Sequence, residues 1–98
     1  MQANKTIEVE NINTPGKVSR VNAAKYSAMK EAFLTVLPKA SPGLTHDEIK
    51  AAVKPYLPSA LFPEGKTSGW WAKTVQLDLE AKGLVIREKT KPLRWFQA

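Results

Sequence analysis

The sequence contains no cysteine, which excludes disulfide bonds, thiolate chemistry and cysteine-ligated metal sites. It contains one histidine, His46, so a metal site that needs two histidines is excluded as well. A Gly-rich phosphate-binding loop is also missing. Helix capping and the helix dipole explain Asp47 and Glu48, while Asp78 and Glu80 would point to different sides of a helix. We therefore expect a protein that is not an enzyme and uses no metal or cofactor.

Long apolar runs are lacking too. No stretch approaches the roughly eighteen apolar residues that a membrane span requires. Residues 1–6 lack the apolar segment of a secretory signal. Together with the absence of cysteine, these features predict a cytoplasmic protein without a membrane partner.

Positive charge, in contrast, is in excess. The 98 residues suit a single domain, and they carry a formal net charge of +6 from 15 basic and 9 acidic side chains. Residues 66–98 contribute +4 of this charge, with seven basic and three acidic side chains. Such asymmetry favours a polyanionic partner, and solubility alone is the competing explanation.

The N-terminal segment alternates apolar and polar residues over 7–12, and residues 17–21 could return as a second short strand. Pro15 and Gly16 lie between these stretches and favour a turn. The pattern predicts a strand or hairpin, or else a partly ordered basic arm, over residues 1–21. The main domain is then expected over residues 22–98.

Two helices are predicted after this segment. Asn22 is a suitable N-cap for the first helix, which should end before Pro38. The second helix begins with a capping box formed by Thr45 and Glu48. A third helix is expected over about residues 69–82, after an irregular loop at 57–68.

The third helix should be capped by Thr67 or Ser68 and should end at Gly83, a residue that readily adopts positive φ. Apolar spacing predicts which positions form the core. These are Tyr26, Met29, Phe33, Val36 and Leu37 in the first helix; Ile49, Ala52, Val53 and Tyr56 in the second; and Trp71, Ala72, Val75 and Leu79 in the third. Leu61 and Phe62 are expected to fix the 57–68 loop to this core.

The end of the chain is predicted to form a hairpin. Residues 84–88 and 93–96 are strand-like, and Pro92 lies near the turn between them. Leu93 and Trp95 share one face of the second strand and are expected to cover the core.

The succession of helix, capped helix, helix and basic hairpin resembles the winged helix-turn-helix over about residues 23–96. The stretch from Leu79 through Glu80 and Gly83 to Val85 carries much of this resemblance. The whole chain also resembles a small bacterial family of uncharacterised winged-helix-like proteins, and residues 69–79 and 91–95 carry this likeness. The resemblance implies an α+β fold: three helices, a C-terminal two-stranded wing and a short N-terminal strand or hairpin.

The resemblance also implies binding of double-stranded DNA, in the manner of a small transcriptional regulator. In such a domain the third helix would face the major groove, and the wing would contact phosphates. The candidate nucleic-acid-binding residues are Lys66, Ser68, Lys73, Gln76, Arg87, Lys89, Lys91 and Arg94. The alternative is that these residues form a solvated helix face and a charged strand edge that prevents aggregation.

A second apolar strip on the third helix supports a different hypothesis. Trp70 and Leu77 lie two helical turns apart on one side. The N-terminal strand would cover this strip, or the strip would bind a protein partner or a second copy of the chain. The alternative function is therefore a protein-interaction or homodimerisation module that does not bind nucleic acid.

Overall fold

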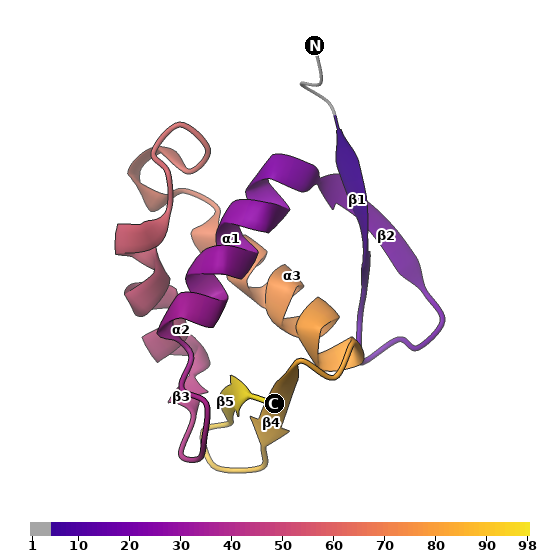
Figure 1. Ribbon diagram of the computed structural model, residues 1–98, viewed down its shortest axis with the longest axis vertical. Coiled ribbons are helices and arrows are strands. Elements are labelled where there is room, and N and C mark those ends of the chain that lie inside the picture. Colours follow the sequence, from indigo (N-terminus) through magenta and orange to yellow (C-terminus); the bar gives the residue numbers. More distant parts are fainter. Residues whose placement is uncertain (1–4) are drawn as a thin grey trace.

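The computed structural model describes residues 5–98, which form a mixed α+β fold with three α-helices and two small antiparallel sheets (Figure 1). The first four residues of the predicted N-terminal arm lie outside the described residues. The helices are α1 (Ala23–Val36), α2 (His46–Val53) and α3 (Ser68–Ala81). The strands are β1 (Thr6–Glu10), β2 (Val18–Asn22), β3 (Leu44–Thr45), β4 (Val85–Glu88) and β5 (Arg94–Gln97). Within residues 5–98, no helix has the length and apolar character needed to cross a membrane.

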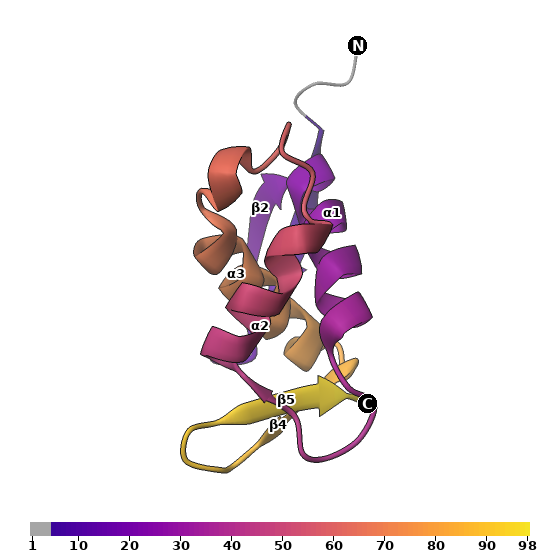
Figure 2. The same ribbon diagram turned by 90° about the vertical axis from the view of Figure 1, so that its left-hand side faces the viewer.

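The two sheets lie at different sides of the helices. Strands β1 and β2 form a hairpin beside α1 and α3 (Figures 1 and 2). The C-terminal sheet, with strand order β3-β5-β4, lies at the end of the molecule opposite the start of β1. The predicted N-terminal and C-terminal hairpins are thus both present. The two-residue strand β3 was not predicted, because two residues are too few to show alternation.

The first two helices begin where the sequence predicts. The Asn22 side chain accepts a hydrogen bond from the backbone N–H of Lys25 at 3.0 Å. Thr45 and Glu48 form the predicted capping box, with reciprocal distances of 2.9 and 3.2 Å. Helix α1 ends because Leu37, before Pro38, adopts an extended conformation.

The start of α3 differs from the prediction. Thr67 precedes the helix in the left-handed conformation (φ 62°), and its hydroxyl donates to the Lys66 carbonyl oxygen. Ser68 is already the first helical residue and is buried. Neither side chain caps the helix, because the left-handed backbone at Thr67 directs its hydroxyl away from the free N–H groups. At the other end, Gly83 has the predicted positive φ of 75°.

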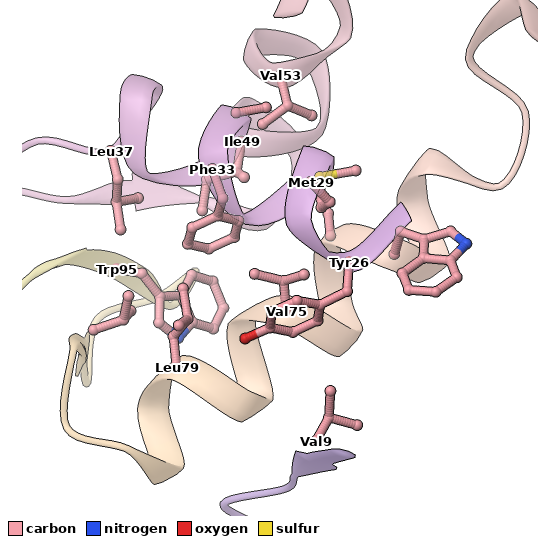
Figure 3. Packing of buried hydrophobic residues seen from close by; sticks show 14 of the residues in the cluster. Val9, Tyr26, Met29, Phe33, Leu37, Ile49, Val53, Val75, Leu79 and Trp95 are labelled. Carbon is pink, nitrogen blue, oxygen red and sulfur yellow. The ribbon is translucent and has the colours of Figure 1, made fainter. Parts of the chain in front are cut away.

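The core lies between the three helices and is closed by Val9 of β1 and Trp95 of β5 (Figure 3). Two core predictions were wrong, since Tyr56 is 57% exposed and Leu93 is 39% exposed. Tyr56 lies in a short 3₁₀ turn, η1 (Lys54–Tyr56), whose tighter winding moves it off the buried stripe of α2. Leu93 precedes β5, so the strand alternation does not reach it. Val36 and Ala52 are half-buried, and the other predicted helix positions are buried.

The long connection between α2 and α3 is held to the core by an aromatic contact. Phe62 is buried and packs edge-to-face on Trp71, with ring centroids 6.4 Å apart. The prediction for Phe62 is confirmed, and Leu61 is half-buried beside the core. A second 3₁₀ turn, η2 (Pro63–Gly65), follows and leads into α3.

One buried carboxylate joins the N-terminal hairpin to two helices. Asp78 of α3 is fully buried and accepts hydrogen bonds from the Glu10 backbone N–H (2.8 Å), the Lys82 ammonium (2.9 Å) and the Tyr26 hydroxyl. Burial and the bond to Asp78 raise the pKa of Tyr26 well above its usual range, so the phenol remains a donor. The β1–β2 hairpin is therefore anchored to the domain and is not a loose arm.

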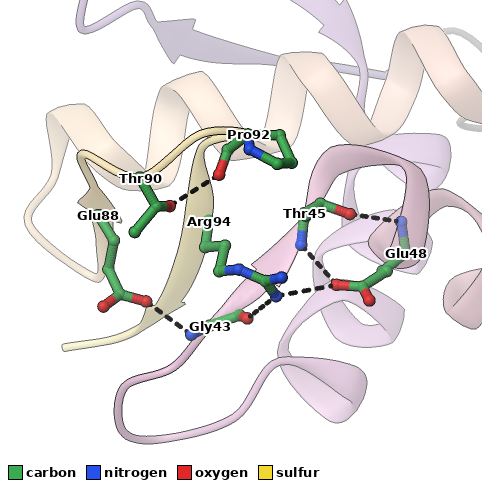
Figure 4. Close-up of polar contacts among 7 residues, drawn as sticks. All are labelled: Gly43, Thr45, Glu48, Glu88, Thr90, Pro92 and Arg94. Atoms are coloured by element: carbon green, nitrogen blue, oxygen red, sulfur yellow. Dashed lines mark hydrogen bonds and ion pairs between the residues drawn. The ribbon is translucent and has the colours of Figure 1, made fainter.

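The C-terminal sheet depends on a close backbone approach at Gly43. A Cβ atom at this position would lie 2.0 Å from the carbonyl oxygen of Trp95. The Gly43 N–H donates to Glu88 at 2.6 Å, and its carbonyl accepts from Arg94 at 3.0 Å (Figure 4). Only glycine fits here, because a side chain would separate β3 from β5.

We expect Gly43→Ala to lower the free energy of unfolding by about 3 kcal/mol, because the added methyl group would meet backbone atoms that are fixed in a sheet. Gly69→Ala is the matched control. Its Cβ would meet the flexible Lys50 side chain at 3.2 Å, and alanine is favoured in a helix, so stability should change by less than about 1 kcal/mol. Denaturant unfolding measures both variants. Equal stability of the two would contradict the tight contact at Gly43.

We expect Asp78→Asn to destabilise the fold by about 2 kcal/mol or more, since the amide group turns a donor toward the groups that donate to the carboxylate. The exposed Glu8, which lies 3.7 Å from Arg20, provides the control, and Glu8→Gln should have little effect. Thermal unfolding, with hydrogen exchange at the Glu10 amide, distinguishes the two. Retained stability together with a slowly exchanging Glu10 amide would show that Asp78 is dispensable.

Candidate nucleic-acid interface

A basic cluster forms where the start of α2 meets α3. We define it as His46 and Lys50 of α2 with Lys73 of α3. A Cβ atom at Gly69 would lie 3.2 Å from the Lys50 side chain, so Lys50 extends across the first turn of α3. Lys73 is exposed on the next turn of the same helix.

The positive charge of this cluster affects the pKa of its histidine, His46. Partial burial lowers the pKa of His46, and the positive charges of Lys73 and Lys50 lower it further against the weaker opposing effect of Asp47. His46 is half-buried. Lys50 and Lys73 are close enough to disfavour protonation of the His46 imidazole. Together they create a local positive potential that would attract an anion.

The loop between β4 and β5 supplies more positive charge. Lys89 and Lys91 are exposed on it, and the Thr90 hydroxyl donates to the Pro92 carbonyl at 2.7 Å within the turn (Figure 4). Figure 2 shows this loop projecting toward the same side as the first turns of α2 and α3. Lys66, just before α3, is also exposed. None of the ion pairs found within residues 5–98 involves these lysines.

The two C-terminal arginines are not the free cations that we expected. Arg87 pairs with Glu80 through two contacts of 2.9 and 3.1 Å, and its guanidinium lies 5.8 Å from the centre of the Trp95 ring. Arg94 donates to the Gly43 carbonyl and lies 3.4 Å from Glu48. Both side chains connect the C-terminal hairpin to the rest of the fold.

The predicted polar strip of α3 is also largely internal. Gln76 is completely buried and donates to Glu80 at 2.9 Å, and Ser68 is only 3% exposed. The prediction that both side chains face a partner was therefore wrong, and Lys73 alone of that strip is exposed. Gln76 and Glu80 are four residues apart, and this spacing favours such a pair. Arg87 of the C-terminal hairpin packs on Glu80.

Sequence reasoning also missed two members of the basic cluster. His46 and Lys50 are four residues apart and therefore lie on one side of α2. That spacing was available in the sequence, but only the packing of α2 against α3 places Lys73 beside them.

Most carboxylates near this side are engaged within the protein. Glu88 accepts hydrogen bonds from the Ser41 hydroxyl and the Gly43 N–H, which lower its pKa. The hydrogen bond from the Thr45 backbone N–H likewise lowers the pKa of Glu48. Asp47 is the exposed carboxylate that remains beside His46. Residues 5–98 hold no group of three His, Asp or Glu side chains placed to bind a metal ion.

The second predicted surface lies on the other side of α3. The β1–β2 hairpin half-buries Leu77, as one of the two sequence hypotheses expected, while Trp70 remains 57% exposed. Between hairpin and helix is an open groove of about 350 Å³, which we call the hairpin groove.

The chain belongs to a family of unknown function, DUF6958, whose profile matches residues 6–95. Comparison with curated proteins gave no match, and comparison with solved structures gave none either. The match extends over both sheets and all three helices, so the N-terminal hairpin is part of the shared family region.

The basic cluster predicts an unusual titration of His46, whose imidazole signal is easily followed by NMR because it is the only histidine. Its pKa should lie below the usual 6.5, and Lys73→Ala should raise it. Because the unfolded chain binds this proton more readily than the folded one, the free energy of unfolding should fall as pH drops through about 6.5. Lys30→Ala on α1 is the control and should leave the titration unchanged. An unshifted His46 in the Lys73→Ala variant would mean that the cluster does not form.

Proposed function

We propose that this protein is a non-catalytic winged-helix domain that binds double-stranded DNA through its phosphates. The observation that carries the proposal is the distribution of charge. The half-buried Lys50 of α2 and the exposed lysines of α3 and the β4–β5 loop belong to segments that face one side of the fold (Figure 2). The nearby arginines and most nearby carboxylates are engaged within the protein.

The order of the elements supports the winged-helix part of the proposal. Helices α1, α2 and α3 are followed directly by the hairpin β4–β5, and Gly83 turns the chain from α3 into β4. The hairpin packs on α3 through the Glu80–Arg87 pair. Strand β3, between α1 and α2, pairs with β5 and ties the hairpin to the start of α2.

The chemistry of the exposed cations indicates which part of DNA they would contact. Arg20, Arg87 and Arg94 all take part in ion pairs, so the cations of this side are lysines. A lysine ammonium is a mobile point charge that suits phosphate oxygens, whereas paired recognition of guanine favours the forked arginine side chain. With Gln76 buried as well, we expect DNA binding with little sequence preference.

The competing hypothesis of a protein-binding or dimerisation surface has less support. Trp70 is exposed, but Leu77 is half-covered by the hairpin, so the predicted apolar strip is interrupted. The other exposed large apolar side chains, such as Tyr56 and Ile86, lie on separate elements. Scattered apolar side chains are normal on a monomeric protein surface.

We expect Lys89→Ala combined with Lys91→Ala to weaken binding to duplexes of different sequence by the same factor. The slope of log affinity against log salt should also decrease by about 2, since each phosphate contact contributes about 0.9. Fluorescence anisotropy with labelled mixed-sequence duplexes at several salt concentrations measures both quantities.

The matched control is Lys25→Ala with Lys30→Ala on α1, which removes the same charge from a helix that lies away from the β4–β5 loop (Figure 2). This control should retain most of the affinity and salt dependence. If the two double variants lose affinity equally, the binding face is wrongly assigned. If the unmodified protein does not bind at low salt, the DNA proposal itself fails.

A further inference from the structure

The hairpin groove has the form of a small-molecule site. The apolar part of its lining is formed by Val9 and Val21 of the hairpin and by Trp70 and Leu77 of α3. A volume of about 350 Å³ lies at the lower end of the range typical of ligand pockets. The space is therefore suited to a ligand of one or two rings.

Trp70 gives this groove an aromatic wall that is already oriented. More than half of the residue is exposed, and its ring packs edge-to-face on Trp71 at a centroid distance of 4.9 Å. Trp71 is itself buried and held by Phe62. Because these contacts fix the ring, a flat ligand would stack on it with little loss of side-chain freedom.

The rim of the groove carries lysine side chains, which favour a ligand with a negative charge. Lys17 and Lys73 line it, and no ion pair found within residues 5–98 involves either of them. Glu10 is the one carboxylate among the lining residues described. The oxygen of Asn11 accepts from the Asn13 backbone N–H at 2.8 Å, which leaves the amide N–H groups of Asn11 available as donors.

We propose that the hairpin groove binds a small planar aromatic carboxylate, with its ring on Trp70 and its anionic group between Lys17 and Lys73. The two parts of the ligand match the two parts of the site. The ring would take apolar surface out of water against Trp70 and Leu77, and the carboxylate would gain charge-assisted contacts at the rim. A neutral ring would make only the first set of contacts.

This site shares Lys73 with the proposed DNA-binding face, but its other residues do not belong to that face. Trp70 and Lys17 line the groove between the N-terminal hairpin and α3, whereas Lys89 and Lys91 lie on the C-terminal hairpin. Binding of an aromatic carboxylate in the absence of DNA therefore tests this inference alone.

The test uses 1-naphthoate as the probe and 1-naphthalenemethanol as its neutral counterpart, each titrated into the ¹⁵N-labelled protein and followed by NMR. We expect naphthoate to bind with a Kd of about 1 mM or lower. The indole N–H of Trp70 and the amides around Glu10 and Lys17 should shift, while the indole of Trp95 should not. Trp70→Phe assigns the Trp70 signal.

Two variants separate the contributions of ring and charge. Trp70→Ala should raise the Kd for naphthoate about tenfold. Lys17→Ala with Lys73→Ala should weaken naphthoate severalfold and leave naphthalenemethanol unaffected. Lys89→Ala with Lys91→Ala is the charge-matched control and should bind naphthoate like the unmodified protein. The Trp71 and Trp95 indole signals report whether each variant is folded.

Three results would overturn the proposal. The first is equal affinity for naphthoate and its neutral counterpart, which would remove the role of the lysines. The second is a set of shifts that lies away from the groove, or no shift at all. The third is a sedimentation measurement in which the protein is a dimer that Trp70→Ala dissociates, because the groove would then be occupied by a second copy of the chain.

Discussion

The buried carboxylate of Asp78 is the interaction on which the arrangement of the N-terminal half depends. A charged group without solvent is costly unless donors surround it, and here the donors come from β1, from α1 and from Lys82 directly after α3. Tyr26 and the Glu10 backbone must therefore stay in register with α3. The hairpin is held along one side of that helix, where it half-covers Leu77 and creates the groove beside Trp70.

A comparable constraint operates at the other end of the molecule. Gly43 lets β3 approach the backbone of Trp95, and Glu88 and Arg94 bind the two polar groups of that glycine. The Gln97 side chain donates to the carbonyls of Leu34 and Leu37, both at 2.8 Å, and so satisfies the C-terminal end of α1. These contacts fix the C-terminal hairpin relative to α1 and α2, and with it the position of the loop that carries the exposed lysines.

The same contacts explain how charge is divided between the interior and the surface. Arginine has a rigid fork of donors. Arg87 uses it for two hydrogen bonds to the Glu80 carboxylate, and Arg94 uses it for the Gly43 carbonyl and the Glu48 carboxylate. The Lys82 ammonium pairs with Asp78, but lysines such as Lys66, Lys89 and Lys91 remain exposed. An overall charge of +6 therefore becomes a surface of lysines suited to phosphates. The pairing of Arg87 and Arg94 with carboxylates also explains why a count of basic residues in the C-terminal hairpin overestimated the number of free cations.

The sequence alone determined the features that depend on neighbours along the chain. The caps at Asn22 and Thr45, the left-handed Gly83 and the buried stripes of the helices follow from interactions within one or two turns, so spacing was enough to predict them. Tertiary structure decided the features that depend on residues far apart in the sequence. It buried Gln76, paired Arg87 with Glu80, inserted β3 beside β5 and brought Lys73 to His46. Whether a polar side chain on a helix faces water or another element depends on what packs against it, and periodicity along one helix carries no information about that partner.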